Sequence, residues 1–251
     1  MTDSPLNRLV DILVEAPGLL EDLDILRKAS NQTEAEYLHN ALMDKCRTCE
    51  MALSSWETEV GPILKAYDYT IIGATLPTPR NDDDLAIIYL SCYYWMTCLL
   101  ILSTKGFTEL ETSPTLTLMS CPSQILARSY AYRIAHAMHL LFHPPVGDYT
   151  AVAVFFPLGN AIRYLIMAET FGGQRIMSKE RLLLTKIFSR PFLGSFVGRF
   201  LKNLQADDGV DYGYSDERLF GMEGVEFRAR VWWCGMGRAG VPGVAPEGAC
   251  P

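Results

Sequence analysis

The chain has 251 residues, 49% of them hydrophobic, which provides for a sizeable core and argues against wholesale disorder. Its formal net charge of −7 argues against a domain that binds nucleic acid through clustered cations. The odd number of cysteines, seven in a long chain, indicates reduced thiols in an intracellular protein. Polar residues directly after Met1 indicate that there is no signal peptide.

The N-terminal region predicts two short helices, over residues 6–16 and 19–29, with a break at Pro17-Gly18. The first of them carries an apolar stripe that we expect to face inward. This stripe consists of Leu6, Leu9, Val10, Leu13 and Val14.

A long helix is predicted next, over residues 33–60. Thr33 and Glu36 have the spacing of a capping box at its start, and Gly61-Pro62 is expected to end it. Its apolar residues recur at steps of three and four, which is one continuous helical stripe. They are Ala35, Leu38, Leu42, Cys46, Cys49, Leu53, Trp56 and Val60.

Residues 85–104 contain no charge, while Asp82 to Asp84 precede them and Lys105 follows. This order suits a helix, with acids at its N-terminus and a cation at its C-terminus. A helix that is apolar on nearly all sides must be surrounded by other helices or by lipid. Tyrosines near its middle favour a buried core helix over a membrane span, because membrane proteins place tyrosine at the interfaces.

Beyond a connector over residues 105–120, a helix is predicted over 122–143, with Pro122 in its first turn. Its apolar positions are Ile125, Leu126, Tyr130, Ile134, Ala137, Met138 and Leu141. A second strongly apolar helix follows over residues 149–171. We expect Asp148 to cap it and Pro157 to kink or break it.

Ser178 is expected to cap a basic helix that ends near residue 189, and residues 192–205 predict a last helix. No stretch shows a clear strand pattern, so the fold class is all-α. We expect one multi-helix domain over residues 1–207, with the two apolar helices 85–104 and 149–171 buried at its centre. Residues 208–251 are rich in glycine and proline and predict a poorly ordered tail.

Two groups of potential metal ligands occur on predicted helices. Cys46 and Cys49 form a CxxC motif without a second pair, so we assign them to core packing. His136, His139 and His143 lie on roughly one helical face, but three residues spread over two turns cannot easily converge on one ion. We therefore predict no stoichiometric zinc, and no metal, cofactor-binding or catalytic residue.

Residues 235–240 match GxGxxG, but Pro242 follows where a dinucleotide-binding fold needs a helix, so the match is interpreted as chance. We predict that the chain is not an enzyme. The alternatives are an enzyme or small-molecule-binding helical protein, in which Arg133, His136 or Arg163 would surround a pocket, and a membrane-associated protein.

The order of several segments resembles the C-terminal regulatory region of fungal zinc binuclear-cluster transcription factors, over about residues 5–205. The segments are Pro17–Leu20, a long helix with Cys46 and Trp56, Tyr93-Tyr94-Trp95, Tyr130–Ile134, and an apolar helix with Pro157 and Arg163-Tyr164. The resemblance implies an all-helical effector domain in the nucleus that controls transcription by RNA polymerase II. Expected partners are proteins of the transcription machinery or a second copy of the chain, and no membrane.

The six-cysteine cluster that reads DNA in that family is missing. We therefore expect the chain alone to bind duplex DNA weakly and without sequence preference. Its basic residues concentrate in 172–205, and we expect them to face solvent or the acidic N-terminal half. They include Lys179, Arg181, Lys186, Arg190, Arg199 and Lys202. The tail after about residue 225 also departs from the family, which suggests a truncated or mis-spliced gene product.

Overall fold

The computed structural model describes residues 4–64, 79, 81–113, 116–142, 149–171 and 178–188. Helices account for nearly all of these residues and no strand occurs among them, so the all-α prediction is confirmed. The elements are α1 (Pro5–Leu13), α2 (Ala16–Arg27), α3 (Gln32–Leu64), α4 (Asp82–Thr112), α5 (Pro122–Ala137), the 3₁₀ helix η2 (Met138–Phe142), α6 (Tyr149–Phe171) and α7 (Lys179–Phe188).

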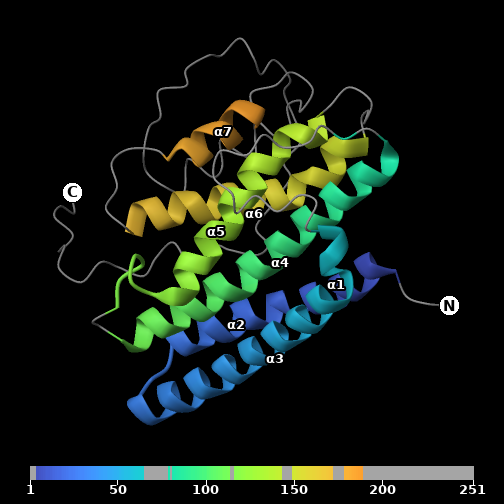
Figure 1. Ribbon diagram of the computed structural model, residues 1–251. Helices are drawn as coiled ribbons and strands as arrows, with labels where there is room; N and C mark the ends of the chain where they lie inside the picture. The colour runs from blue at the N-terminus through green and yellow to red at the C-terminus, as the bar shows by residue number, and fades with distance from the viewer. Residues whose placement is uncertain are drawn as a thin grey trace, which may run out of the picture.

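Helix α4 runs through the middle of the molecule (Figure 1). Helices α1, α2 and α3 pack on one side of it, and α5 and α6 pack on the other, with α7 against α5 and α6. Buried side chains from Leu9 in α1 to Leu184 in α7 belong to one hydrophobic cluster. The two apolar helices predicted to be central, α4 and α6, both contribute many buried residues to this cluster.

The surroundings of α4 explain why so long an apolar helix is stable in this fold. Among the described residues it is the one helix long and apolar enough to cross a membrane. However, most of its apolar window, 61%, is buried inside the protein. The packing against α2, α3, α5 and α6 favours the core-helix interpretation over a span.

Helix α4 starts as the charge order predicts, with Asp82, Asp83 and Asp84 in its first turn. The Asn81 side chain caps it by accepting from the backbone N–H of Asp84 at 2.9 Å. Its end was predicted wrongly. Lys105 does not close the helix. Its Nζ instead reaches both carboxylate oxygens of Glu50 in α3 at 2.8 Å. This lateral ion pair holds the lysine against α3, and the helix continues to Thr112 where a connector was predicted.

The boundary between the first two helices also differs from the prediction. Pro17 does not break a helix but lies in the first turn of α2, where its missing N–H needs no partner. The chain turns earlier, at Val14 and Glu15. Leu9 is buried as predicted, but Val10, within α1, is 37% exposed, and Val14, just after the end of α1 at Leu13, is 60% exposed.

Helix α3 begins before the predicted capping box. Asn31 caps it, accepting from the N–H of Glu34 at 2.9 Å, and the Glu34 carboxylate reaches back to the N–H of Ser30. Glu36 instead accepts from the Gln32 amide. The predicted Thr33–Glu36 box is therefore wrong by two residues, since Asn31 offers the same cap earlier. The helix also passes through Gly61-Pro62 to Leu64.

The predicted stripe of α3 is confirmed from Leu42 onward, since Leu42, Cys46, Cys49, Leu53, Trp56 and Val60 are all buried. Ala35 and Leu38 at its start are partly buried and pack against the core. The stripe of α5 is partly wrong. Ile125 and Leu126 are each 52% exposed, and the buried face lies one residue further round the helix. That face includes Gln124, Ala127, Ala131, Ile134 and Ala135. Its small side chains let α5 approach α4 closely.

Helix α6 is continuous through Pro157, so the proline does not break it. The expected cap of α7 is confirmed, because the Ser178 hydroxyl accepts from the N–H of Arg181 at 3.2 Å. The predictions for Asp148, for the helix 192–205 and for the tail 208–251 lie outside the described residues, as does His143, the predicted end of the helix that begins at Pro122.

Candidate functional site: an apolar groove beside helix α4

An apolar groove of about 400 Å³ opens where the α1–α2 corner approaches α6. Eight residues line it: Leu13, Val14, Ala16, Pro17, Leu20, Leu100, Phe156 and Asn160. Seven of the eight are apolar, so the groove offers a ligand dispersion contacts and very few hydrogen bonds. Its volume falls within the range of about 300–1,000 Å³ found for small-molecule sites.

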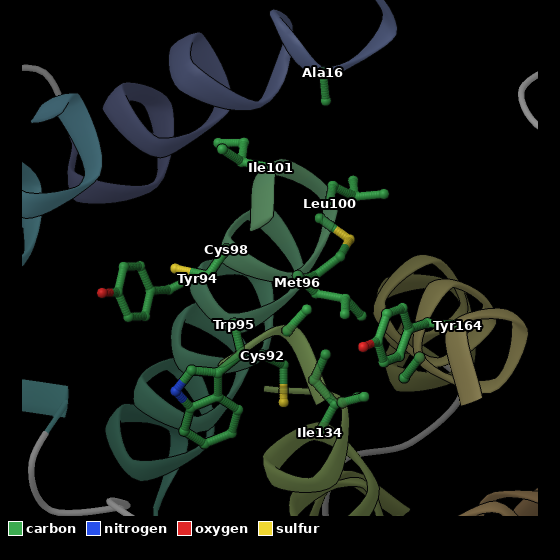
Figure 2. Packing of buried hydrophobic residues seen from close by; sticks show 14 of the residues in the cluster. Ala16, Cys92, Tyr94, Trp95, Met96, Cys98, Leu100, Ile101, Ile134 and Tyr164 are labelled. Atoms are coloured by element: carbon green, nitrogen blue, oxygen red, sulfur yellow. The ribbon is translucent and has the colours of Figure 1, made fainter. Parts of the chain in front are cut away.

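Local sequence explains each wall of the groove. The turn at Val14 and Glu15 brings the end of α1 and the first turn of α2 together as one wall. Leu100 of α4, which is 6% exposed, forms the floor. Figure 2 shows Leu100 on the side of α4 that faces Ala16. Phe156 supplies the other wall from α6, next to Pro157.

Two large side chains at the groove remain well exposed, Val14 at 60% and Phe156 at 44%. Isolated exposed apolar side chains are common on protein surfaces. Here they adjoin a concave apolar lining. The groove is therefore a candidate binding surface among the described residues.

Asn160 is the single polar residue of the lining. Its side-chain Nδ2 donates to the backbone oxygen of Phe156 at 2.8 Å, one helical turn earlier. This bond uses one of the two hydrogens on Nδ2, so the amide can still donate one hydrogen bond and accept others through Oδ1. A ligand in the groove can thus be recognised by one hydrogen bond.

Away from the groove, aromatic rings link α3, α4 and α5. Trp56 stacks on Tyr94 with ring centroids 5.1 Å apart, and Tyr94 meets Tyr130 edge-on at 6.2 Å. The guanidinium of Arg133 lies 5.1 Å from the centroid of Tyr130. Burial raises the pKa of both tyrosines, which keeps them protonated and suits a packing role.

A buried polar network joins α4, α5 and α6. Gln124 donates from Nε2 to the backbone oxygen of Ser103 at 3.0 Å. The Tyr164 hydroxyl lies 2.9 Å from the backbone oxygen of Gln124 and 3.0 Å from its Oε1. Gly106 makes room for it, because a Cβ there would come within 2.7 Å of Gln124. These polar groups satisfy one another and so serve the fold.

The cysteines of the CxxC motif lie in the core, as predicted. Cys46 is fully buried and Cys49 is 5% exposed. Burial raises the pKa of Cys46 to about 12 and also raises that of Cys49, so both thiols stay protonated and weakly nucleophilic. Neither residue lines the groove.

The histidine group is divided by the structure. His136 is exposed, and its Nε2 lies 3.5 Å from the carboxylate of Glu180 in α7. His139 is also exposed, and His143 lies outside the described residues. Among the residues that the structure describes, no three His, Cys, Asp or Glu side chains come together as metal ligands. The predicted absence of zinc stays a prediction.

The basic region contains one ion pair that the sequence did not suggest. Arg181 is buried and pairs with Glu169 of α6 at 2.8 Å, while Glu169 also accepts from the N–H of Ser178. Arg181 therefore faces neither solvent nor the acidic N-terminal half, which corrects that prediction. Lys179 and Lys186 are exposed, and the remaining cations of this region lie outside the described part of the chain.

The residues named for an enzyme pocket do not gather at the groove. Arg133 packs on Tyr130, His136 faces α7, and Arg163 is absent from the lining. Comparisons of the chain with protein-family models, with curated proteins and with solved structures found no match. Pro17, Phe156 and Asn160 were not singled out as site residues from sequence, since nothing in a linear pattern places α2 beside α6.

Proposed function

We propose that the chain is a regulatory interaction domain that acts in transcription control by RNA polymerase II, as the sequence resemblance implies. It works in the nucleus through a bound partner or ligand and has no catalytic role of its own. Its partners are proteins of the transcription machinery or a second copy of the chain, and sequence-specific DNA contact belongs to another polypeptide segment.

The observation that carries this proposal is the lining of the groove. Seven apolar residues and one amide, Asn160, offer binding surface without an acid, a base or a nucleophile. General acid–base or covalent chemistry needs such groups within hydrogen-bond reach of a substrate. A lining of this composition favours recognition, and a regulatory domain needs only recognition.

A reporter assay in a fungal cell tests the regulatory role. The full chain would be fused to an unrelated DNA-binding module that has no effector region of its own. We expect the fusion to change transcription from the matching reporter several-fold relative to the module alone.

Val14→Asp places a charge at the groove, while Ile25→Asp makes the same kind of change at a 45% exposed residue of α2 outside it. The proposal expects the first substitution to reduce the regulatory effect and the second to leave it intact. Unchanged transcription with a fusion present at normal levels would contradict the regulatory role.

A further inference from the structure

We infer that the acidic C-terminal segment 207–227 of this chain docks on the exposed face of helix α5. The inference goes beyond the proposed function and does not depend on the groove. Three observations support it: an apolar patch exposed on α5, arginines beside this patch that no carboxylate neutralises, and a segment of the same chain that carries the opposite charge together with large apolar side chains.

The N-terminal half of α5 and the turn before it present large apolar side chains to solvent. Met119 is 56% exposed, and Ile125 and Leu126 are each 52% exposed. Pro122, one turn before Leu126, is exposed as well. Because residues three and four apart are neighbours on a helix surface, Pro122, Ile125 and Leu126 adjoin one another. These four residues form the α5 patch, and a segment that covers it removes apolar surface from water.

The side chains of α5 that can be charged are all cationic. The helix contains Arg128, Arg133 and His136 and no aspartate or glutamate. The Arg128 guanidinium lies 3.1 Å from the sulfur of Met119, and that of Arg133 lies over the ring of Tyr130. Among the described residues, no carboxylate is within ion-pair distance of either arginine. The α5 patch therefore suits an occupant that is both apolar and acidic.

The sequence supplies an occupant of this chemistry. Residues 207–227 contain seven acids and one base, which gives them a formal charge of −6, nearly all of the −7 of the whole chain. Large apolar residues are interspersed with these acids, among them Tyr212, Tyr214, Leu219, Phe220 and Phe227. The acids complement the two arginines, and the apolar side chains complement the patch.

The chain between α7 and the acidic segment is long enough for this contact. Helix α7 packs against α5 and ends at Phe188. Eighteen residues, 189–206, then precede the segment. Fully extended they span roughly 60 Å, whereas the 16 residues of α5 extend over about 24 Å. A segment tethered in this way has an effective concentration on the order of millimolar, so even a weak contact is occupied.

Charge also distinguishes this occupant from an anionic membrane or a nucleic acid. Either of these would meet two arginines on α5 but would repel a chain whose net charge is −7. The acidic segment is part of that charge and competes for the same arginines within the molecule.

Photo-cross-linking in the full chain tests the contact. The photoreactive residue p-benzoylphenylalanine in place of Leu126 samples the α5 patch. The same residue in place of Met51, which is 66% exposed on α3, is the control. We expect mass spectrometry to map cross-links from position 126 into residues 207–227, with a yield several-fold above that from position 51.

Charge variants separate specific docking from random contact. Arg133→Glu should lower the yield from position 126 several-fold, while Arg47→Glu, the same change on α3, should leave it unchanged. Replacing Asp207, Asp208 and Asp211 together with asparagine should also lower the yield. That variant alters no residue of the described helices, so it tests the charge match even where Arg133→Glu disturbs folding. Added salt should act in the same direction, because it screens exposed charges.

Equal yields from positions 126 and 51, or a yield that neither the asparagine variant nor salt reduces, would overturn the docking. Cross-links from position 126 that map only to other parts of the chain would overturn it as well. Mixing isotope-labelled with unlabelled protein shows which chain supplies the segment. Cross-links that join a labelled to an unlabelled copy would overturn the contact within one chain in favour of a second copy.

Discussion

On the side of α4 that faces α5, Gly106 lets the Gln124 side chain come into direct contact with the helix backbone. On the side that faces the α1–α2 corner, Leu100 lies at the floor of an open groove. The first contact is built from small residues and satisfied hydrogen bonds. The second is built from larger apolar residues that do not interlock. The same helix thus has one closed side, which stabilises the fold, and one open side, which is available for binding.

Two adjacent leucines of α4 give the largest expected effects. Leu99 is 1% exposed within the core, while Leu100 is 6% exposed and borders the groove. Leu99→Ala should lower the free energy of unfolding by about 2–5 kcal/mol, because it leaves a cavity in packed surroundings. Leu100→Ala should cost clearly less, because part of its surroundings is already open.

Urea denaturation of both variants measures the difference between the two leucines. An equal loss would mean that both sides of α4 are packed to the same density, and the comparison between them would fail.

A pair of glycines gives the next largest effect. Gly106→Ala pushes a Cβ against Gln124, which two hydrogen-bonded groups hold in place, and should destabilise the protein by about 1–3 kcal/mol. Gly18→Ala in α2 meets no atom within 4 Å and should stabilise it by about 0.4–1 kcal/mol. Thermal melts of the two variants should therefore shift in opposite directions.

The dependence of stability on alkaline pH tests whether the core excludes water. Burial raises the pKa of the Cys46 thiol from 9.0 to about 12, so between these values the unfolded chain loses a proton that the folded chain keeps. Stability is therefore fully present below about pH 9 and falls as pH rises toward 12. This one thiol contributes at most about 1.4 kcal/mol per pH unit to the slope of the unfolding free energy against pH.

Cys46→Ala should flatten the alkaline slope relative to the wild type, whatever its effect at neutral pH. The measurement is the free energy of unfolding at several pH values between 8 and 11 in reducing buffer. An unchanged slope would show that water reaches the thiol.

The smallest expected effect is at the rim of the groove. Val14→Ala removes carbon atoms from a side chain that is 60% exposed and should change stability by no more than about 0.5 kcal/mol. Leu9→Ala, on the same short helix but fully buried, should cost about 2–5 kcal/mol. Similar losses for both would mean that the rim is part of the core.

Local periodicity was sufficient to predict the buried stripe of α3 and the helical class, because both depend on the spacing of residues along one helix. The helix ends were less predictable where distant partners decide them. Lys105 looked like a terminal cation in sequence, but Glu50, 55 residues earlier, holds it in mid-helix. On α5, the face that packs closely against α4 is the one that carries alanines, and the larger Ile125 and Leu126 are exposed.

The groove could not be predicted for a different reason. Its wall residues, such as Leu13 and Phe156, have the same apolar character as core residues, and only the fold decides whether such side chains meet or leave a space. The buried pair of Glu169 and Arg181 was hidden in the same way, because a basic segment gives no sign of which cation turns inward.

The indole of Trp56 is an intrinsic fluorophore that contacts α1. Its Nε1 donates to the backbone oxygen of Pro5 at 2.8 Å, at the first residue of α1, and its ring stacks on Tyr94. Any displacement of α1 that breaks this bond alters the polarity around the indole and hence its emission wavelength. Once the other three of the four tryptophans are replaced, the helix whose far end borders the groove can be followed by fluorescence, without an attached dye.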